Sequence, residues 1–193
     1  MCIRDRLWIV PLVVIGLADA LAGIVARQVA GAVGIQLDAS ITGILSVLVF
    51  GAGTNYALLL IARYRDELRL HEDRREAMQR ALRGAGPAII ASGSTVALAL
   101  LTLLLAEIAG NRALGLACAV GILVAMFFAL FVLPAALVLF GRGLFWPYIP
   151  RFNSPDAISR SVWGKLGRGV SKRPVLVASV GFVALGALSL IHI

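Results

Sequence analysis

The sequence predicts an all-α integral membrane protein built as a multi-helix transmembrane bundle. Of its 193 residues, 60% are hydrophobic and only 15% are charged. The mean hydropathy of +0.94 lies well above the range of soluble domains. The apolar residues form continuous runs that approach or exceed about 20 residues, the length at which a helix crosses a hydrocarbon layer. These runs do not alternate between apolar and polar residues, as strands of a membrane β-barrel would.

Five apolar runs carry the predicted helices. They cover residues 7–26, 41–62, 87–107, 114–140 and 174–187. We expect the first four to cross the membrane within one domain, residues 7–140, and the fifth to be the start of a further transmembrane helix. Their Gly, Ala, Ser and Thr residues favour close helix approach, which lipid requires because packing there gains nothing from expelling water.

The basic residues indicate an orientation. They gather in segments 63–83 and 141–173, whereas the other two connections hold only Arg27 and Arg112. By the positive-inside rule, both arginine-rich segments are cytoplasmic. The formal charge of +8 therefore indicates a lipid membrane as partner and no nucleic acid, since the arginines flank apolar runs and do not line a polar, aromatic-rich surface.

Segment 63–83 places acids and arginines at helical spacing beside a modest apolar side, which predicts a cytoplasmic amphipathic helix. Its cluster HEDRRE, residues 71–76, lacks the paired histidines of a zinc helix, so a solvated charged face is favoured over a metal site. Segment 141–173 opens with GRGLFWPYIPRF, which is typical of chain lying along the headgroup layer, and continues as a cytoplasmic linker. We expect neither a metal nor a cofactor.

Both ends of the chain resemble translations of one short DNA element. Residues 1–6, MCIRDR, match one strand of a transposon end used in sequencing libraries, and residues 188–193, LSLIHI, match the complementary strand. We therefore expect both ends to be adapter-derived and the remainder to be an internal fragment of a longer protein. Without these ends one cysteine, Cys118, remains, which allows no disulfide within the chain.

A polar notch, GAGTNYA, interrupts the second apolar run. An unpaired Asn or Asp in hydrocarbon is costly, so such residues suggest function. At 1.5 Å per residue, Asn55 lies about 12 Å into the membrane and Asp19 about 18 Å in from the same side. We expect the two at neighbouring depths on antiparallel helices. Asp19 is the better proton carrier and Tyr56 can donate to a carboxylate. The alternatives are an interhelical hydrogen bond for Asn55 and a position near the outer interface for Asp19.

Small and hydroxylated residues accompany these candidates. Gly51 and Gly53 permit close approach of another backbone, and Thr54 lies beside them. On the third run, Ser92 and Thr95 offer hydroxyls to a relay. Helical Ser and Thr usually bond back to their own turn, however, and this alternative is favoured.

The notch and the RYRDE sequence at residues 63–67 resemble the MMPL family of the resistance-nodulation-division (RND) superfamily, and the resemblance covers residues 7–187. It implies a proton-driven exporter of lipids, siderophore-like molecules or drugs in the bacterial inner (plasma) membrane, built from two similar six-helix halves. The chain would hold helices three to six of one RND-type half and the start of helix seven. Its partners would be membrane lipids, a hydrophobic or lipid substrate and the missing second half, with a homo-oligomer as a further option.

The resemblance also implies that Asn55 stands where family members carry the aspartate of an Asp-Tyr proton relay. An amide does not exchange a proton at physiological pH, so titration would fall to the missing half or to Asp19. The alternative is a non-transporting scaffold or lipid-sensing module of the same architecture, where an Asn would be natural. We expect no enzyme, because no nucleophile, base and orienting group come together. The substrate-binding residues are not predicted.

Overall fold

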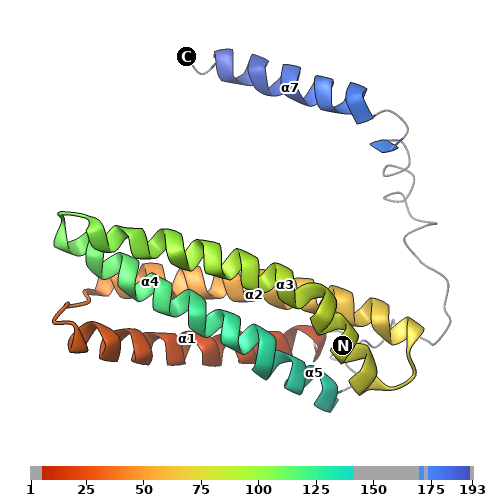
Figure 1. Ribbon diagram of the computed structural model, residues 1–193, viewed down its shortest axis with the longest axis horizontal. Helices are drawn as coiled ribbons and strands as arrows, with labels where there is room; N and C mark the ends of the chain where they lie inside the picture. The colour runs from red at the N-terminus through yellow and green to blue at the C-terminus, as the bar shows by residue number, and fades with distance from the viewer. Residues whose placement is uncertain (1–5, 141–169, 172–173, 192–193) are drawn as a thin grey trace. The chain divides into compact units, whose positions relative to one another are not determined.

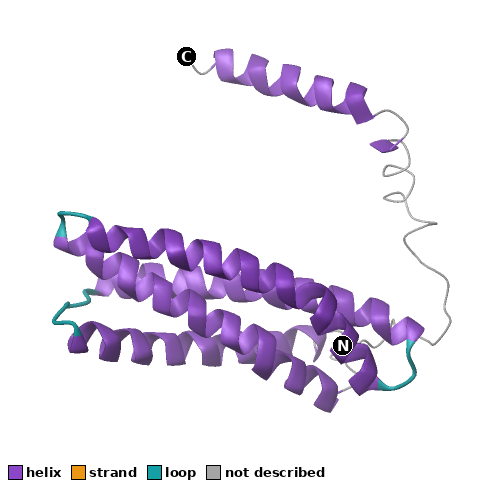
Figure 2. Cartoon of the chain, viewed as in Figure 1, coloured by secondary structure: helices purple, strands orange, loops and turns teal. Residues whose placement is uncertain are grey.

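The computed structural model describes residues 6–140, 170–171 and 174–191. All regular elements in these ranges are helical, which confirms the predicted all-α class (Figure 2). The bundle consists of α1 (Arg6–Ala32), α2 (Ala39–Leu70), α3 (Arg74–Leu101), a 3-10 turn η1 (Thr102–Leu105), α4 (Ala109–Phe127), a π-helical turn η2 (Phe128–Val132) and α5 (Leu133–Phe140) (Figure 1).

The described bundle has four helical segments that are long and apolar enough to cross a membrane, and each overlaps one of the first four predicted runs to within two residues at its ends or extends beyond it. Their bounds are Ile9–Ala32, Ala39–Leu70, Arg74–Leu105 and Ala109–Phe140. A separate unit of the chain contains α7 (Pro174–Ile191). The apolar part of α7, Val177–Leu188, is shorter than a membrane span, so a transmembrane helix beginning at residue 174 stays a prediction. Most of segment 141–173 lies outside the described residues, as do residues 1–5 and 192–193.

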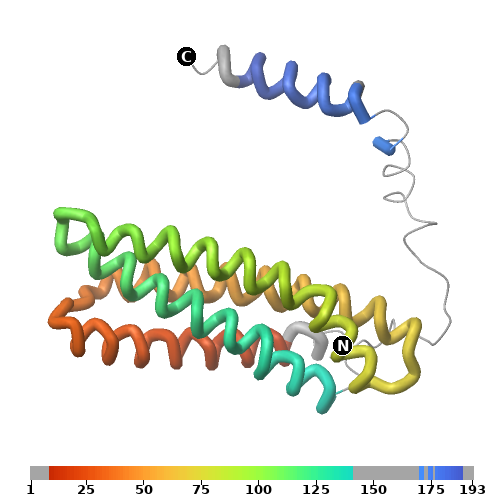
Figure 3. The backbone as a smooth tube through the Cα atoms, in the orientation of Figure 1, coloured from red at the N-terminus to blue at the C-terminus, as the bar shows by residue number. Residues whose placement is uncertain are grey.

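The helices α1, α2, α3 and α4 run alternately in opposite directions, and α5 continues the direction of α4, as the tube in Figure 3 shows. The helices α2 and α4 pack against each other, and α1 and α3 each pack against both of them. Along α1, buried alanines recur every four residues and form a smooth stripe that allows close packing. These alanines are Ala18, Ala22, Ala26 and Ala30, and each is at most 2% exposed.

Aspartate caps and a glycine turn set the ends of the helices. After α1 the chain turns through Gly34, whose φ of 75° lies in the left-handed region that glycine adopts without strain. Asp38 then caps α2 by accepting a hydrogen bond of 2.8 Å from the backbone N–H of Ile41. At the other end of the bundle, Asp73 caps α3 by accepting a bond of 3.0 Å from the backbone N–H of Arg75.

The prediction of one separate amphipathic helix over residues 63–83 is wrong. The helix α2 continues without a break to Leu70, and α3 begins at Arg74, so the segment forms the extended ends of two spanning helices. The break falls at residues 71–73 because the Asp73 cap starts a new helix there. Pro87 lies inside α3 and does not separate two helices, since membrane helices tolerate a proline whose freed carbonyl finds another partner. We call this end of the bundle, residues 63–83, the arginine-rich end.

Glycines at the helix crossings generate a prediction for stability. A Cβ at Gly115 of α4 would lie 2.5 Å from the carbonyl oxygen of Leu100 and 2.6 Å from the Cβ of Leu103. We expect Gly115→Ala to lower the free energy of unfolding by about 1–3 kcal/mol, because backbone must move to make room. Titration of the protein from mild detergent into dodecyl sulfate, followed by circular dichroism, measures this.

The control is Gly110→Ala on the same helix, where nothing lies within 4 Å of the added Cβ. We expect this variant to unfold like the wild-type protein. Equal loss of stability in both variants would contradict the packing account.

Candidate functional site

The residues of the notch point in different directions around α2, some into the bundle and some away from it. Gly53, Tyr56 and Ala57 are buried, whereas Gly51 and Asn55 are exposed and Thr54 is intermediate. The sequence predicts one polar site at these positions. The structure shows two surfaces instead, because neighbours in a helix differ by about 100° in direction.

Tyr56 points into the bundle and is only 3% exposed. A Cβ at Gly93 of α3 would lie 3.3 Å from the Tyr56 hydroxyl and 2.8 Å from the sulfur of Met126 on α4. The tyrosine therefore reaches over Gly93 in the space between α3 and α4. Sequence reasoning missed Gly93, because a glycine in an Ala- and Ser-rich helix carries no signal that a particular side chain lies on it.

The two glycines of the notch differ in role. A Cβ at Gly53 would lie 3.3 Å from the side chain of Ile15 on α1, so this position has the close helix approach that the sequence predicts. Gly51 has nothing within 4 Å of the equivalent position and lies on the bundle surface. A packing role for Gly51 stays a prediction.

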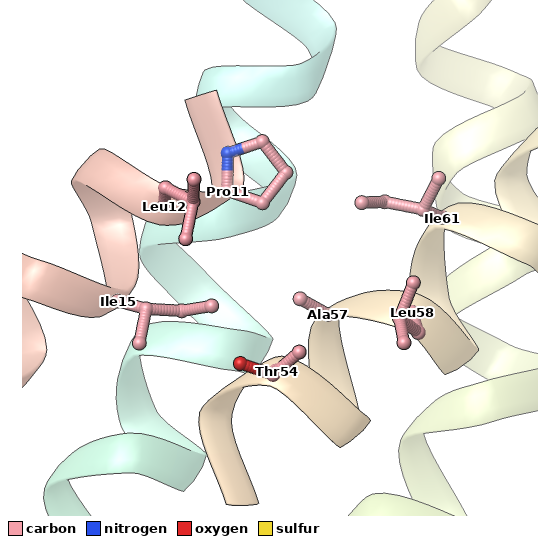
Figure 4. Close-up of a pocket in the computed structure, with 7 residues that line it drawn as sticks. All are labelled: Pro11, Leu12, Ile15, Thr54, Ala57, Leu58 and Ile61. Carbon is pink, nitrogen blue, oxygen red and sulfur yellow. The ribbon is translucent and has the colours of Figure 1, made fainter. Parts of the chain in front are cut away.

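Thr54 lines a small apolar pocket between α1 and α2 (Figure 4). The volume of the pocket is about 100 Å³. Six apolar residues share its wall with Thr54: Pro11, Leu12, Ile15, Ala57, Leu58 and Ile61. The pocket can therefore accommodate a hydrocarbon group. None of its lining residues carries a charge that could pair with a charged ligand.

Asn55 lies at the level of Ser92 on the neighbouring helix. Two contacts fix the register of the antiparallel helices α2 and α3, one between Arg63 and Gly84 and one between Tyr56 and Gly93. Asn55 is eight residues before Arg63 and Ser92 is eight residues after Gly84, and both are exposed. The outer surface of the α2–α3 pair therefore carries an amide and a hydroxyl at the same depth.

The hydroxyl of Thr95 forms a hydrogen bond within its own helix. Thr95 is exposed, and its hydroxyl donates a hydrogen bond of 2.8 Å to the carbonyl oxygen of Ala91 one turn earlier. This is the back-bonding that the sequence analysis favours for Thr95. The structure records no equivalent bond for Ser92, whose part in a relay stays a prediction.

Asp19 lies near the predicted depth but is not joined to the notch. It is four residues beyond Ile15, which packs on Gly53, and Asn55 is two residues from Gly53 in the opposite direction, so Asp19 and Asn55 lie about 9 Å apart along the bundle axis. Asp19 is half-buried and Asn55 faces away from the bundle. Among the residues that the structure describes, no hydrogen bond or ion pair involves Asp19. A relay through Asp19 therefore needs a partner from outside this bundle.

A second cluster of polar groups lies at the arginine-rich end, where sequence analysis favours a solvated face. Within the described ranges, Glu67 is the buried charged residue, with its side chain 8% exposed. Its carboxylate lies 3.2 Å from a guanidinium nitrogen of Arg63 and 3.4 Å from Nδ1 of His71. The opposite ring nitrogen of His71, Nε2, lies 3.9 Å from Glu76, which pairs with Arg80 at 2.9 Å. Of these contacts, the one between His71 and Glu76 joins the end of α2 to the start of α3.

Residues 72–76 of the cluster HEDRRE are exposed, in agreement with the solvated face favoured for it, whereas Glu67, one turn earlier on α2, is buried. The spacing of Arg63, Glu67 and His71, four residues apart, is visible in the sequence and indicates pairing. Burial is not visible, because it depends on the turn at residues 71–73 bringing α3 back over α2. Among the described residues, no three His, Cys, Asp or Glu side chains gather as metal ligands would.

Comparison with known proteins identifies the family of this bundle. The sequence model of the MMPL family matches residues 6–177. The chain belongs to the MMPL family. Residues 63–67 and the notch, with Asn55 in place of the aspartate that the resemblance implies, lie within the matched range.

Three relatives illustrate the similarity. The chain is 45% identical to the membrane protein ActII-3 of Streptomyces coelicolor, over 95% of this chain and 26% of that protein. It is 36% identical to the apo-petrobactin exporter of Bacillus anthracis, over 94% of this chain and 26% of the exporter. It is 32% identical to the sulfolipid-1 exporter MmpL8 of Mycobacterium tuberculosis, over 86% of this chain and 15% of the exporter.

The chain thus spans about a quarter or less of the length of these relatives. No solved structure matches it. A multi-pass membrane location follows from the family and from the four apolar helices.

The Glu67 cluster generates a second prediction. Glu67→Gln keeps the shape of the side chain and removes the charge that Arg63 and His71 share. We expect a loss of about 1–3 kcal/mol in unfolding free energy, the range for hydrogen bonds to a charged group, and faster hydrogen exchange of the amides at residues 71–73.

The matched control is Asp66→Asn, which neutralises an exposed carboxylate one residue away. We expect exchange at residues 71–73 to stay unchanged in this variant. Unchanged exchange in Glu67→Gln would show that the cluster does not hold the turn.

Proposed function

We propose that this chain is part of a proton-motive-force-driven exporter of lipids or other hydrophobic compounds in the bacterial inner membrane. Membership of the MMPL family supports this proposal, together with relatives that are named exporters of apo-petrobactin and of sulfolipid-1. The observation that carries it furthest is the mid-span pair of Asn55, exposed, and Tyr56, buried, on α2. The arginine-rich end would face the cytoplasm by the positive-inside rule.

The exposed amide of Asn55 calls for a partner. In hydrocarbon an unpaired amide is costly, and the described part of the chain supplies no hydrogen bond to it. A second half of the same polypeptide, packed on the outer surface of α2, would provide one. The same surface carries Gly51, whose missing side chain permits a close helix approach.

The proton carrier in this proposal is a carboxylate other than residue 55. An Asn side chain does not titrate at physiological pH, so this half contributes a hydrogen bond and Tyr56 a hydroxyl. Asp19, half-buried and about 9 Å from Asn55 along the bundle axis, is the ionisable candidate within the bundle. A carboxylate on the equivalent helix of the second half is the other candidate.

One observation favours a second function. The replacement of the relay aspartate by Asn55 suits a membrane scaffold or lipid-sensing module of the same architecture, which needs no titrating group. A carboxylate at the equivalent position of the second half would favour transport. An amide or an apolar residue there would favour the scaffold or sensor.

We expect Asp19→Asn, introduced into the full-length exporter, to reduce proton-coupled export to background, because an amide at this depth does not carry a proton. Export of a fluorescent hydrophobic substrate from inverted vesicles under an imposed pH gradient measures this. Glu107→Gln, at an exposed carboxylate in the connection between α3 and α4, is the control and should retain export. Export unchanged by Asp19→Asn would assign the proton to the second half.

The chain alone should insert into liposomes without transporting. Four spanning helices are present, but the partner of the α2 surface is not among them. Proton flux into liposomes containing only these 193 residues, followed with an internal pH dye, should equal that of empty liposomes. A substrate-dependent proton flux would contradict the need for a second half.

A further inference from the structure

A basic pocket lies at the arginine-rich end, in the seam between the last turns of α2 and the first turns of α3. Its volume is about 570 Å³, and it is separate from the notch. Three arginines and two carboxylates line it, together with Gly84: Arg63, Arg80, Arg83, Glu67 and Glu76. The proposed export function uses none of these residues.

The carboxylates of the pocket already have partners. Glu67 pairs with Arg63 at 3.2 Å and is buried, and Glu76 pairs with Arg80 at 2.9 Å. Arg83 is exposed and forms no ion pair with another described residue. The charge of Arg83 is therefore not compensated within the pocket. The side chains of Arg63 and Arg80 are about half exposed, at 52% and 53%.

Gly84 positions Arg63 toward α3. A Cβ at Gly84 would lie 2.8 Å from Nε of Arg63, so the guanidinium group of Arg63 rests directly on the backbone of α3. This contact brings the cation of one helix next to Arg83, the residue before Gly84 on the other. Two helices thus present guanidinium groups to one shared space.

The pocket lies at the depth of lipid headgroups. Arg63 directly follows the apolar run 41–62, and Arg83 precedes the apolar run that starts at residue 87. Toward the middle of the membrane, the seam continues past exposed small and apolar residues, Ala62 and Leu59 on α2 and Ala88 on α3. An acyl chain can lie along this surface while its phosphate stays among the arginines.

We propose that this pocket binds the phosphate of an anionic phospholipid from the leaflet at the arginine-rich end, with the lipid tails along the α2–α3 seam. Guanidinium groups bind phosphate oxygens with paired, charge-assisted hydrogen bonds. Arginines near a membrane surface add attraction for anionic lipids over zwitterionic ones. The site stands independently of transport, since it needs only the two helix ends.

Native mass spectrometry of the purified chain in detergent, titrated with phosphatidylglycerol or phosphatidylcholine, tests the proposal. We expect phosphatidylglycerol to bind more tightly, and Arg83→Gln to weaken its binding about fivefold, the effect of one arginine at a membrane surface. The matched control is Arg65→Gln, an exposed arginine at the same end that does not line the pocket, which should bind like the wild-type chain.

A second variant changes the pocket without changing its charge. Gly84→Ala forces the flexible Arg63 side chain away from α3 and keeps every charge of the pocket, so it should weaken phosphatidylglycerol binding. Equal binding of both lipids, or equal weakening by Arg65→Gln and Arg83→Gln, would overturn the proposal in favour of unspecific charge attraction. Displacement of the lipid by millimolar inorganic phosphate would assign the site to the free ion.

Discussion

Close approach of helices at residues without side chains is the constraint on which the bundle depends. In lipid, helices associate through packing and hydrogen bonds, because the surrounding tails are as apolar as the side chains. At each of three crossings here a glycine faces a bulky group of another helix. Gly121 of α4 lies against Leu45 and Val49 of α2, Gly53 lies against Ile15 of α1, and Gly93 lies beneath Tyr56. These contacts hold α1 and α3 on the central pair α2 and α4.

This packing decides how the polar notch is used. With Gly53 turned toward α1 and Tyr56 toward α3 and α4, the geometry of a helix directs Asn55 away from the bundle. The hydroxyl of Tyr56 therefore lies inside the bundle, whereas the amide of Asn55 lies on its surface, although the two residues are neighbours in the sequence. The bundle supplies the surroundings of Tyr56 from its own helices, whereas those of Asn55 come from outside it. In the proposed function, the notch is therefore one edge of a site that further protein would complete.

The sequence predicted those features that depend on local composition. Apolar run length predicts the four long helices, and the polar residues at 54–56 stand out against their surroundings, because hydrophobicity is read residue by residue. Burial of Glu67 and the contact of Tyr56 with Gly93 depend on how helices distant in sequence pack. No spacing rule within one run reveals such contacts. The single amphipathic helix predicted for residues 63–83 failed for a related reason, since one aspartate cap at residue 73 outweighs the periodicity around it.

The extension of α2 past the apolar run has a mechanical meaning. A straight helix of 32 residues is about 48 Å long, whereas the hydrocarbon layer is about 30 Å thick. About two turns of α2, residues 63–70, extend past the apolar run, and His71 at their end lies 3.9 Å from Glu76 of α3. A small tilt of α2 about a point at mid-membrane would move its end at Leu70 farther than the residues near that point. The end of α2 and the start of α3 thus form a helical hairpin that continues beyond the apolar runs.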